Sequence, residues 1–236
     1  AFLRGGSCTE SAGHRTAIYY RDRNTDQTVE VDPGTAPNPP GLIRATPDGR
    51  SVVFTTQTSH SLEDENEGYD IYRWDSEGGE YTCLSCIVED AGVLGRVVVS
   101  DDFSHFYFTS PRQLVPGHGM PGDISIYSLG EGELNYVAPG SILSLYRAKV
   151  SSDGNVLVFR SNHETYTRLT ADEQADECKG FVVDTTAPDC RALFRYEDST
   201  NSLECLSCLP GGVTTNSVGE TNAAAALSED GETVAF

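Results

Sequence analysis

The apolar residues of this chain recur in short runs, each of which follows a similar polar turn. Four copies of this cassette read Thr46-Pro-Asp-Gly-Arg-Ser-Val-Val-Phe54, Ser100-Asp-Asp-Phe-Ser-His-Phe-Tyr-Phe108, Ser151-Ser-Asp-Gly-Asn-Val-Leu-Val-Phe159 and Ser228-Glu-Asp-Gly-Glu-Thr-Val-Ala-Phe236. Because Asp and Gly accept the positive φ that hairpin turns require, the cassette predicts a turn followed by a strand. The second copy has Asp102-Phe103 in place of Asp-Gly, so we expect its turn to differ.

A second pattern of short aromatic strands alternates with the cassette. Its copies are Ala17-Ile-Tyr-Tyr-Arg-Asp22, Asp70-Ile-Tyr-Arg-Trp-Asp75, Ser125-Ile-Tyr-Ser-Leu-Gly130 and Ala192-Leu-Phe-Arg-Tyr-Glu197. Each copy is followed by a polar or glycine-rich turn and another β-prone run: Thr28–Val31, Glu80–Cys83, Glu133–Val137 and Ser202–Cys205. Such pairs predict hairpins. No segment shows a convincing helical period.

The spacing of the cassettes predicts the architecture. The aligned aspartates at 48, 102, 153 and 230 are separated by 54, 51 and 77 residues. A unit of about fifty residues with four strands has the size of a β-propeller blade. The strands of one unit are expected at Gly41–Ala45, Ser51–Thr56, Tyr69–Asp75 and Glu80–Cys83. The expected fold class is all-β, a β-propeller of four-stranded antiparallel blades.

The repeat register divides the chain, expected to be a single propeller domain, into about four blades' worth of strands. A half-blade is expected at 1–40, full blades at 41–90, 91–140 and 141–212, and a half-blade at 213–236, with an insertion at 162–189 in the third full blade. Both ends of the chain therefore fall inside a blade. We favour a segment of a larger ring. The alternatives are closure by joining the two half-blades, or their completion by neighbouring molecules in an oligomer or filament.

The cassette, followed by a stretch such as Asp70-Ile-Tyr-Arg-Trp-Asp75, resembles the TolB-like, or PD40-type (WD40-like), propeller repeats over almost the whole chain. The stretches Phe108-Thr-Ser-Pro-Arg-Gln-Leu-Val-Pro-Gly117 and Glu80-Tyr-Thr-Cys-Leu-Ser-Cys86 resemble exported bacterial members, especially actinobacterial ones. This resemblance implies a ring of about six to eight blades in a periplasmic or extracellular location. It implies no single activity, because such propellers serve both as interaction platforms and as companions of enzyme domains.

The charge of the chain narrows the choice of partners. With 36 acidic and 16 basic residues, the formal net charge is −20, which repels phosphate backbones and anionic lipid. Nucleic acid is therefore not expected as a partner. No apolar run approaches the roughly 20 residues that span a bilayer, so membrane insertion is not expected either. The charge is read as keeping a secreted protein soluble, with attraction of cations or of a basic partner as the alternative.

The tetrapeptide Cys-Leu-Ser-Cys occurs twice, each time just after a predicted fourth strand. Haem attachment would require a histidine next, but Ile87 and Leu209 follow. A thioredoxin-type site requires a helix, and none is predicted. One zinc ion shared by both pairs is disfavoured, because the outer strands of blades two apart lie too far from each other; each rim is ~15–20 Å beyond its inner strand.

Local disulfides are therefore favoured for both tetrapeptides. The predicted bridges are Cys83–Cys86, Cys205–Cys208 and Cys178–Cys190, the last of which would close the insertion. Cys8 remains without an assigned partner. This use of cysteine indicates an oxidising compartment: the periplasm, the cell surface or the extracellular space.

One loop is dense in oxygen-bearing side chains. It reads Asp64-Glu-Asn-Glu-Gly-Tyr-Asp70, a composition that suits hard cations such as calcium. The candidate ligands are Asp64, Asn66 and Asp70. The alternative is a solvated turn, because the pattern lacks the glycine placement and the terminal glutamate of an EF-hand. No other cofactor is expected.

No catalytic residue is predicted. The sequence has no Gly-x-Ser-x-Gly motif. The histidines show no metal-binding spacing and are expected on the surface: His14, His60, His105, His118 and His163.

The predicted function is that of a non-catalytic extracellular scaffold, which binds a protein or a glycan through its loop faces or assembles with itself. The enzyme question stays open, with an inclination towards no enzyme. The alternative is a propeller-type hydrolase or lyase whose site lies on the loop face between second and third strands, in Gln57–Gly68, Arg112–Gly122 and Asn162–Asp189.

Overall fold

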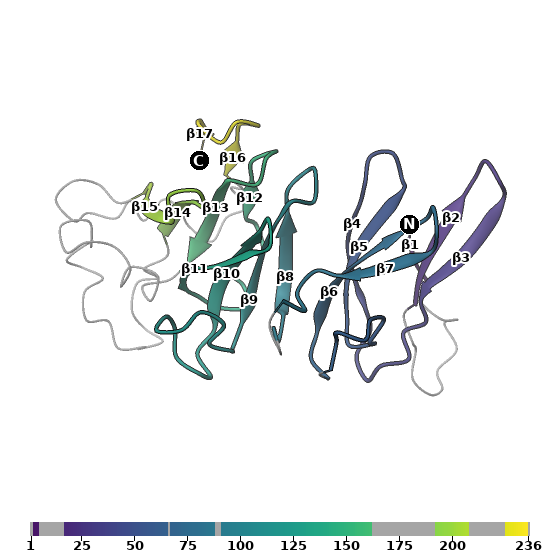
Figure 1. Ribbon diagram of the computed structural model, residues 1–236. Coiled ribbons are helices and arrows are strands. Elements are labelled where there is room, and N and C mark those ends of the chain that lie inside the picture. Colours follow the sequence, from purple (N-terminus) through teal and green to yellow (C-terminus); the bar gives the residue numbers. More distant parts are fainter. Residues whose placement is uncertain are drawn as a thin grey trace, which may run out of the picture. The chain divides into compact units, whose positions relative to one another are not determined.

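The computed structural model describes residues 2–4, 17–65, 67–87, 91–161, 192–207 and 225–235. Every regular element in these residues is a β-strand (Figure 1). The chain forms two compact units, Ala1–Val93 and Leu94–Phe236. Within the described ranges there is no helix with the length and apolar character needed to cross a bilayer. The expectation of an all-β chain is confirmed.

The first unit contains two antiparallel sheets. One has the order β1-β2-β3, and the other has the order β4-β5-β6-β7. Their strands are β1 (Phe2–Arg4), β2 (Ala17–Asp22), β3 (Gln27–Asp32), β4 (Gly41–Ala45), β5 (Ser51–Thr56), β6 (Asp70–Asp75) and β7 (Glu80–Cys83). The second sheet has the four expected strands, although β6 begins one residue later. The first sheet has β1 in addition to the two strands expected from the sequence.

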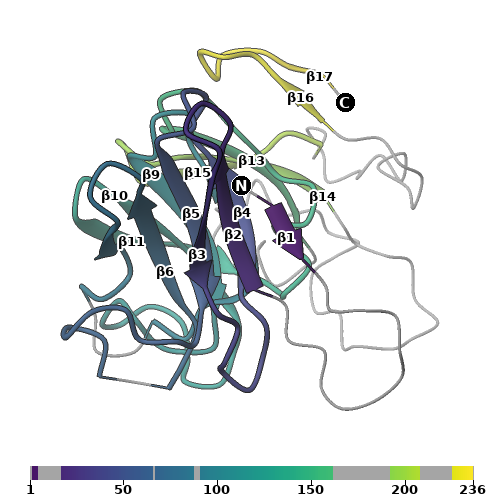
Figure 2. The ribbon, with the colours of Figure 1, turned by 90° about the vertical axis from the view of Figure 1, so that its right-hand side faces the viewer.

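The second unit contains three antiparallel sheets, two of them four-stranded. The orders are β11-β10-β9-β8, β12-β13-β14-β15 and β16-β17; the β16–β17 hairpin is the yellow element in Figure 2. The strands are β8 (Leu94–Val99), β9 (His105–Ser110), β10 (Ser125–Gly130), β11 (Glu133–Pro139), β12 (Lys149–Val150), β13 (Val156–Ser161), β14 (Ala192–Glu197), β15 (Ser202–Cys205), β16 (Ala226–Leu227) and β17 (Val234–Ala235). Consecutive strands pair as neighbours, as in propeller blades.

One buried aromatic pair lies at the centre of each four-stranded sheet. The cassette phenylalanine of the second strand is the direct cross-strand partner of the aromatic residue in the third strand. The pairs are Phe54 and Tyr72, Phe108 and Tyr127, and Phe159 and Phe194, with ring centroids 6.1, 5.9 and 5.6 Å apart. Rings at such distances attract each other by about 0.5–1.5 kcal/mol beyond the effect of burial. This pairing explains why the two sequence patterns occur together.

Neighbouring sheets within each unit pack face to face through apolar clusters. In the first unit, Ile18 and Val31 of one sheet join Val52, Phe54 and Trp74 of the next. In the second unit, a corresponding cluster contains buried residues of β9, β10 and β11 together with residues of β13 and β14: Tyr107, Ile126, Val137, Ala138, Leu157, Phe159, Ala192, Phe194 and Tyr196. The sheets are therefore stabilised mainly by burial between their faces.

The cassette turn has the same hydrogen bonds in all four copies. The aspartate Oδ1 accepts the backbone N–H two residues later, at Arg50, Ser104, Asn155 and Glu232, over 2.9–3.0 Å. The Ser or Thr hydroxyl oxygen accepts the N–H five residues later, at Ser51, His105, Val156 and Thr233, over 2.9–3.0 Å. Hydroxyl and amide donors lower the pKa of the aspartate carboxyl at Asp48, Asp153 and Asp230. At Asp102 burial raises the pKa, but the hydrogen bonds from Ser104 and Ser100 outweigh it, so this pKa is lowered as well.

The expectation that the second copy would form a different turn is wrong. The Phe103 N–H donates to the Ser100 carbonyl over 3.3 Å, as Gly49 N–H does to Thr46 over 2.9 Å. Phe103 has a φ of 59°, close to the 71° of Gly49. The Ser100 and Asp102 side chains stabilise the turn through their hydrogen bonds. Phe103 therefore adopts a left-handed backbone conformation that is unfavourable for a bulky residue.

We predict different losses of stability for two glycines of the cassette. Gly49→Ala should destabilise the fold by about 1 kcal/mol, because only its positive φ penalises a side chain; a Cβ there meets nothing within 4 Å. Gly154→Ala should cost about 3 kcal/mol, because its Cβ would lie 2.3 Å from His105 Cβ. Urea unfolding followed by tryptophan fluorescence and circular dichroism measures both; equal losses would contradict the packing argument.

We predict that Phe103→Gly stabilises the fold by about 0.5–1 kcal/mol. The relief of the left-handed conformation exceeds the entropy that glycine adds to the unfolded chain. Arg50→Gly serves as the control, because it adds the same entropy at the residue that follows the positive-φ glycine of the first cassette. Thermal unfolding should give a higher midpoint temperature for Phe103→Gly than for the unmodified chain, and a lower one for Arg50→Gly.

Candidate functional site

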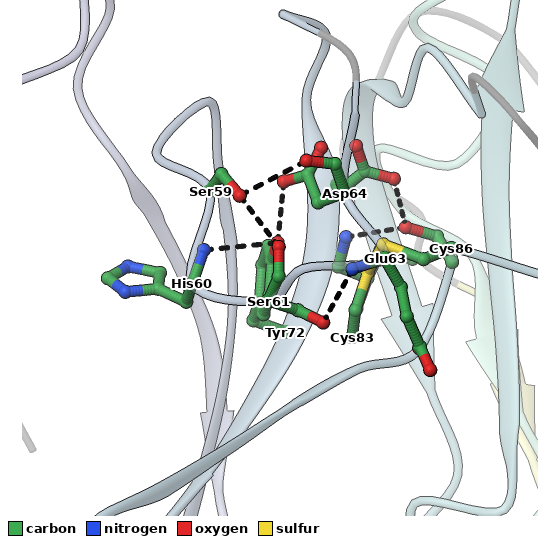
Figure 3. The surroundings of a disulfide bond; sticks show 11 residues. Ser59, His60, Ser61, Glu63, Asp64, Tyr72, Cys83 and Cys86 are labelled. Carbon is green, nitrogen blue, oxygen red and sulfur yellow. Dashed lines mark hydrogen bonds between the residues drawn. A yellow bond between two sulfur atoms is a disulfide. The ribbon is translucent and has the colours of Figure 1, made fainter.

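The candidate site of the first unit consists of the described part of the β5–β6 loop, residues 57–65 and 67–69, and the Cys83–Cys86 disulfide at the end of β7 (Figure 3). It contains the predicted calcium loop, one of the loop histidines and one Cys-Leu-Ser-Cys tetrapeptide. These are features that the sequence singled out as candidates, and the structure describes the contacts that their residues make.

Tyr72 connects the β5–β6 loop to the sheet. Its hydroxyl donates to Asp64 Oδ2 over 2.5 Å and accepts the backbone N–H of His60 over 3.3 Å. The Ser59 hydroxyl also donates to the Asp64 carbonyl over 3.2 Å. Burial, together with the Asp64 carboxylate, raises the pKa of Tyr72, so the phenol remains a donor. Asp64 is thus a buried anchor of the loop.

His60 joins the loop to the neighbouring sheet of the same unit. Its Nε2 lies 3.0 Å from Oδ2 of Asp32, which is fully buried at the end of β3. Its ring stacks on Tyr81 with centroids 4.3 Å apart, and the Tyr81 hydroxyl donates to the Val31 carbonyl. Burial opposes ionisation of Asp32, but hydrogen bonds from His60, Gly34 and Thr56 outweigh it and lower the pKa of this carboxyl.

The prediction of surface histidines is therefore wrong for His60, whose side chain is only 11% exposed. It is also wrong for His105, at 16% exposure. It is confirmed for His118, which is exposed and stacks on Tyr136 with centroids 5.2 Å apart. His14 and His163 lie outside the described residues.

A second polar cluster, in the other unit, surrounds Asp198. This carboxylate accepts hydrogen bonds from the hydroxyls of Ser128 and Tyr196, and its Oδ2 lies 3.7 Å from His105 Nε2. The Ser104 hydroxyl lies 2.9 Å from His105 Nδ1 but donates its proton to Asp102 over 2.7 Å. In this geometry the Ser104 hydroxyl proton is directed at Asp102 and not at His105. Through the Ser128–Asp198 hydrogen bond the cluster links two sheets.

The Cys83–Cys86 disulfide is present, as predicted. Between the two cysteines, the Ser85 hydroxyl donates to Asp70 Oδ1 over 2.5 Å and accepts the Ile71 N–H over 2.9 Å. Cys205 is also disulfide-bonded. The other cysteines of the sequence lie outside the described residues, so their pairings stay predictions: Cys8, Cys178, Cys190 and Cys208.

Two of the three candidate calcium ligands have hydrogen-bond partners within the protein. Asp64 is bonded to Tyr72, Asp70 is bonded to Ser85, and Asn66 lies outside the described residues. Within the described part of the chain, one group of three potential metal-binding side chains converges, namely Asp70, Cys83 and Cys86, with ligand atoms within 4.8 Å of one another. Its two sulfur atoms are bonded to each other. Calcium binding stays a prediction.

Sequence reasoning missed the carboxylates that join neighbouring sheets, Asp32 and Asp198. Asp32 lies 28 residues from His60, and Asp198 lies 70 residues from Ser128. No local motif encodes such separations. The signal available in the sequence was an acidic residue at the end of a predicted strand or directly after it.

The comparisons support the fold. No family model matches the sequence, and no curated protein matches it either. The β-propeller domain of the Trilobed protease from Pyrococcus furiosus is similar with a TM-score of 0.51 and 11% identity, over 86% of this chain and 52% of that chain. The acylaminoacyl peptidase of Pyrococcus horikoshii has a TM-score of 0.50 and 12% identity, over 86% and 30%. TolB from Acinetobacter baumannii has a TM-score of 0.45 and 17% identity, over 93% and 42%.

These comparisons define a class of fold. The chain has the β-propeller fold, as the four-stranded antiparallel sheets and the repeat predicted. At such identities the likeness concerns the fold alone. The chain spans 52% of the Trilobed protease propeller, 30% of the acylaminoacyl peptidase and 42% of the TolB structure. Its activity and partners are therefore matters for proposal.

We predict that His60→Phe destabilises the fold by about 2–4 kcal/mol, because it leaves the buried Asp32 carboxylate without its histidine. The pKa of Asp32 is lowered in the folded state, so its contribution to stability is full above 3.8 and is lost as the pH falls through the folded value. The difference in the free energy of unfolding between variant and wild type should therefore become smaller below pH 3.8.

His118→Phe is the matched control, since its ring is exposed and stacks on Tyr136. It should change stability by no more than about 0.5 kcal/mol. Urea unfolding at several pH values measures both variants. Equal effects of the two substitutions would contradict a structural role for the His60–Asp32 pair.

Proposed function

We propose that this chain is a non-catalytic, exported β-propeller platform that binds another protein through the loops at one end of its sheets. The proposal is supported most directly by the position of the exposed apolar side chains of the second unit. It also agrees with the resemblance of the repeats to TolB-like propellers.

The carrying observation concerns the end of the β8–β11 sheet where the β9–β10 loop meets the segment after β11. The Gly140 N–H donates to the Ile124 carbonyl over 2.9 Å, so these two segments lie side by side. Of the seven large apolar residues that are exposed in the described part of the chain, four lie here: Met120, Ile142, Leu143 and Tyr146, at 48–67% exposure. We call these four residues the apolar end.

Such a gathering is typical of a protein-binding surface, because a soluble chain rarely exposes several large apolar side chains together. Methionine and tyrosine are enriched at interfaces. The net charge of −20 favours a partner with basic residues around its own apolar contact.

The contacts of the polar side chains give less support to the alternative function, a hydrolase or lyase. In the described β5–β6 and β9–β10 loops, the buried or partly buried polar side chains serve as anchors: His60 with Asp32, Asp64 with Tyr72, and Tyr127 with the Arg112 carbonyl. A catalytic acid or base would instead face a substrate.

The proposed location is the periplasm, the cell surface or the extracellular space. Disulfides persist in oxidising compartments, and two of the cysteines are joined to each other. We further propose that the sheets belong to a single propeller domain and form part of a larger ring. A glycan ligand, or a second copy of this chain on the same surface, is the alternative occupant.

The test compares three immobilised chains: wild type, the double variant Leu143→Asp with Tyr146→Asp, and the control Val29→Asp. Val29 is exposed on β3 of the other unit. Proteins of the source organism's secreted fraction are passed over each chain. We expect one protein to bind wild type and control alike, and to bind the double variant at least about tenfold more weakly, since interface anchors each contribute more than about 1 kcal/mol.

Equal binding to all three chains, or binding to none, would overturn the proposed surface. Two further measurements on the same variants distinguish the other occupants. Binding of glycans that the double variant loses would assign the surface to a sugar. Sedimentation of wild type as an oligomer and of the double variant as a monomer would assign it to self-association.

A further inference from the structure

A fully buried carboxylate lies beside the Cys83–Cys86 disulfide. Asp70 opens β6 with no exposed surface, and its carboxylate oxygen and the two sulfur atoms all lie within 4.8 Å of one another. Ser85 fixes the orientation of the carboxylate by donating its hydroxyl to Asp70 Oδ1 over 2.5 Å. The three side chains therefore converge on one point from a rigid hairpin.

The other Cys-Leu-Ser-Cys tetrapeptide shows that the hairpin does not require this carboxylate. There, the Leu206 N–H donates to the Leu193 carbonyl over 2.8 Å and the Leu193 N–H donates to Ser207 Oγ over 3.0 Å. The same two bonds in the first hairpin join Leu84 to Ile71 and Ile71 to Ser85, over 2.8 and 2.9 Å. The residue at the position of Asp70 is Ala192, which is equally buried.

A buried carboxylate is unfavourable unless bonding partners compensate for the lost hydration. Because the second hairpin forms the same two hydrogen bonds with alanine at the equivalent position, Asp70 adds a chemical group that the fold itself does not require. Its neighbours are two sulfur atoms, and a carboxylate with two thiolates is a ligand set that zinc accepts and calcium does not.

We propose that, once the disulfide is reduced, Cys83, Cys86 and Asp70 bind one zinc ion, with water as the fourth ligand. Zinc bonds of about 2.3 Å to sulfur and about 2.1 Å to oxygen place tetrahedral ligand atoms about 3.5–3.8 Å apart. On reduction the two sulfur atoms, which are bonded to each other in the structure, must move apart to this spacing. The Asp70 oxygen already lies within 4.8 Å of both sulfur atoms. Both cysteines are partly exposed, which gives the metal and its water access.

The reaction balances in two steps. A dithiol reductant transfers two electrons and two protons to the disulfide, so the S–S bond breaks, two thiols form and the reductant becomes a disulfide. The two thiols then lose their protons to solvent as they bind Zn²⁺. In the reverse direction a disulfide oxidant accepts two electrons from the two thiolates and two protons from solvent, so the S–S bond re-forms, the oxidant becomes a dithiol and the ion is released. The hairpin thus has two alternative states, a disulfide and a zinc site.

The first experiment uses the unmodified chain. The protein is reduced with a phosphine, freed of reductant, mixed with one equivalent of Zn²⁺ and treated with an alkylating reagent, and the modified cysteines are mapped by mass spectrometry. We expect zinc to slow alkylation of Cys83 and Cys86 at least tenfold and to leave Cys205 reactive. Equal protection of Cys83 and Cys205, or no protection, would overturn the proposal.

The second experiment tests the carboxylate. In the reduced state, Asp70→Asn should bind Zn²⁺ at least tenfold more weakly than wild type, as judged by competition with a chromogenic chelator. Asp64→Asn is the matched control, because it alters a buried carboxylate that precedes the same strand but lies outside the ligand group. Affinity that is unchanged in Asp70→Asn would show that the thiolates act without Asp70 and would overturn the site.

A third measurement remains decisive if Asp70→Asn does not fold. Co²⁺ bound to the reduced wild-type chain should show the absorption of a tetrahedral site with two thiolates, and oxidation of the protein should abolish it. A spectrum that indicates octahedral coordination without sulfur, or one that persists in the oxidised chain, would contradict the proposal.

Discussion

The stacking of one aromatic ring on its cross-strand partner is the interaction on which each blade depends. The pairs formed by Phe54 with Tyr72, Phe108 with Tyr127 and Phe159 with Phe194 lie at the same register in three sheets. Each pair joins the second strand to the third, the two strands that are separated by the longest loops. Once these rings pair, the register of the sheet is determined, because a slip by one residue would turn each ring to the opposite face.

The cassette turn and the carboxylates between sheets complete this arrangement with polar bonds. Inside the turns, backbone N–H groups donate to Asp48, Asp153 and Asp230. Between sheets, Asp32 connects two sheets of the first unit and Asp198 connects two sheets of the second. Most of the groups that resemble catalytic residues are thus structural. In the proposed function, recognition falls to the surface of the loops, where the apolar end of the second unit exposes four large apolar side chains.

The two Cys-Leu-Ser-Cys hairpins illustrate how a repeat acquires a local specialisation. Both have the same backbone bonds around the serine, and they differ at the first residue of the preceding strand, where Asp70 corresponds to Ala192. The change is tolerated because it lies in the hairpin at the outer edge of one sheet and leaves the hydrogen bonds of that hairpin intact. Chemistry can therefore be added to one hairpin without altering the others.

The sequence by itself determined the blade repeat and the strand order of a four-stranded blade, because these depend on local patterns: the polar turn, the alternation of apolar residues and the spacing of about fifty residues. It also identified the Cys83–Cys86 disulfide, whose partners are three residues apart. It did not predict β1. It misjudged Phe103, since only the completed turn shows that side-chain hydrogen bonds impose a positive φ. It misjudged His60 and did not single out Asp32 or Asp198, and it did not predict that the Asp70 carboxylate lies beside the sulfur atoms of Cys83 and Cys86. Those roles arise where strands distant in the sequence pack together, and only the tertiary structure decides which buried charges meet.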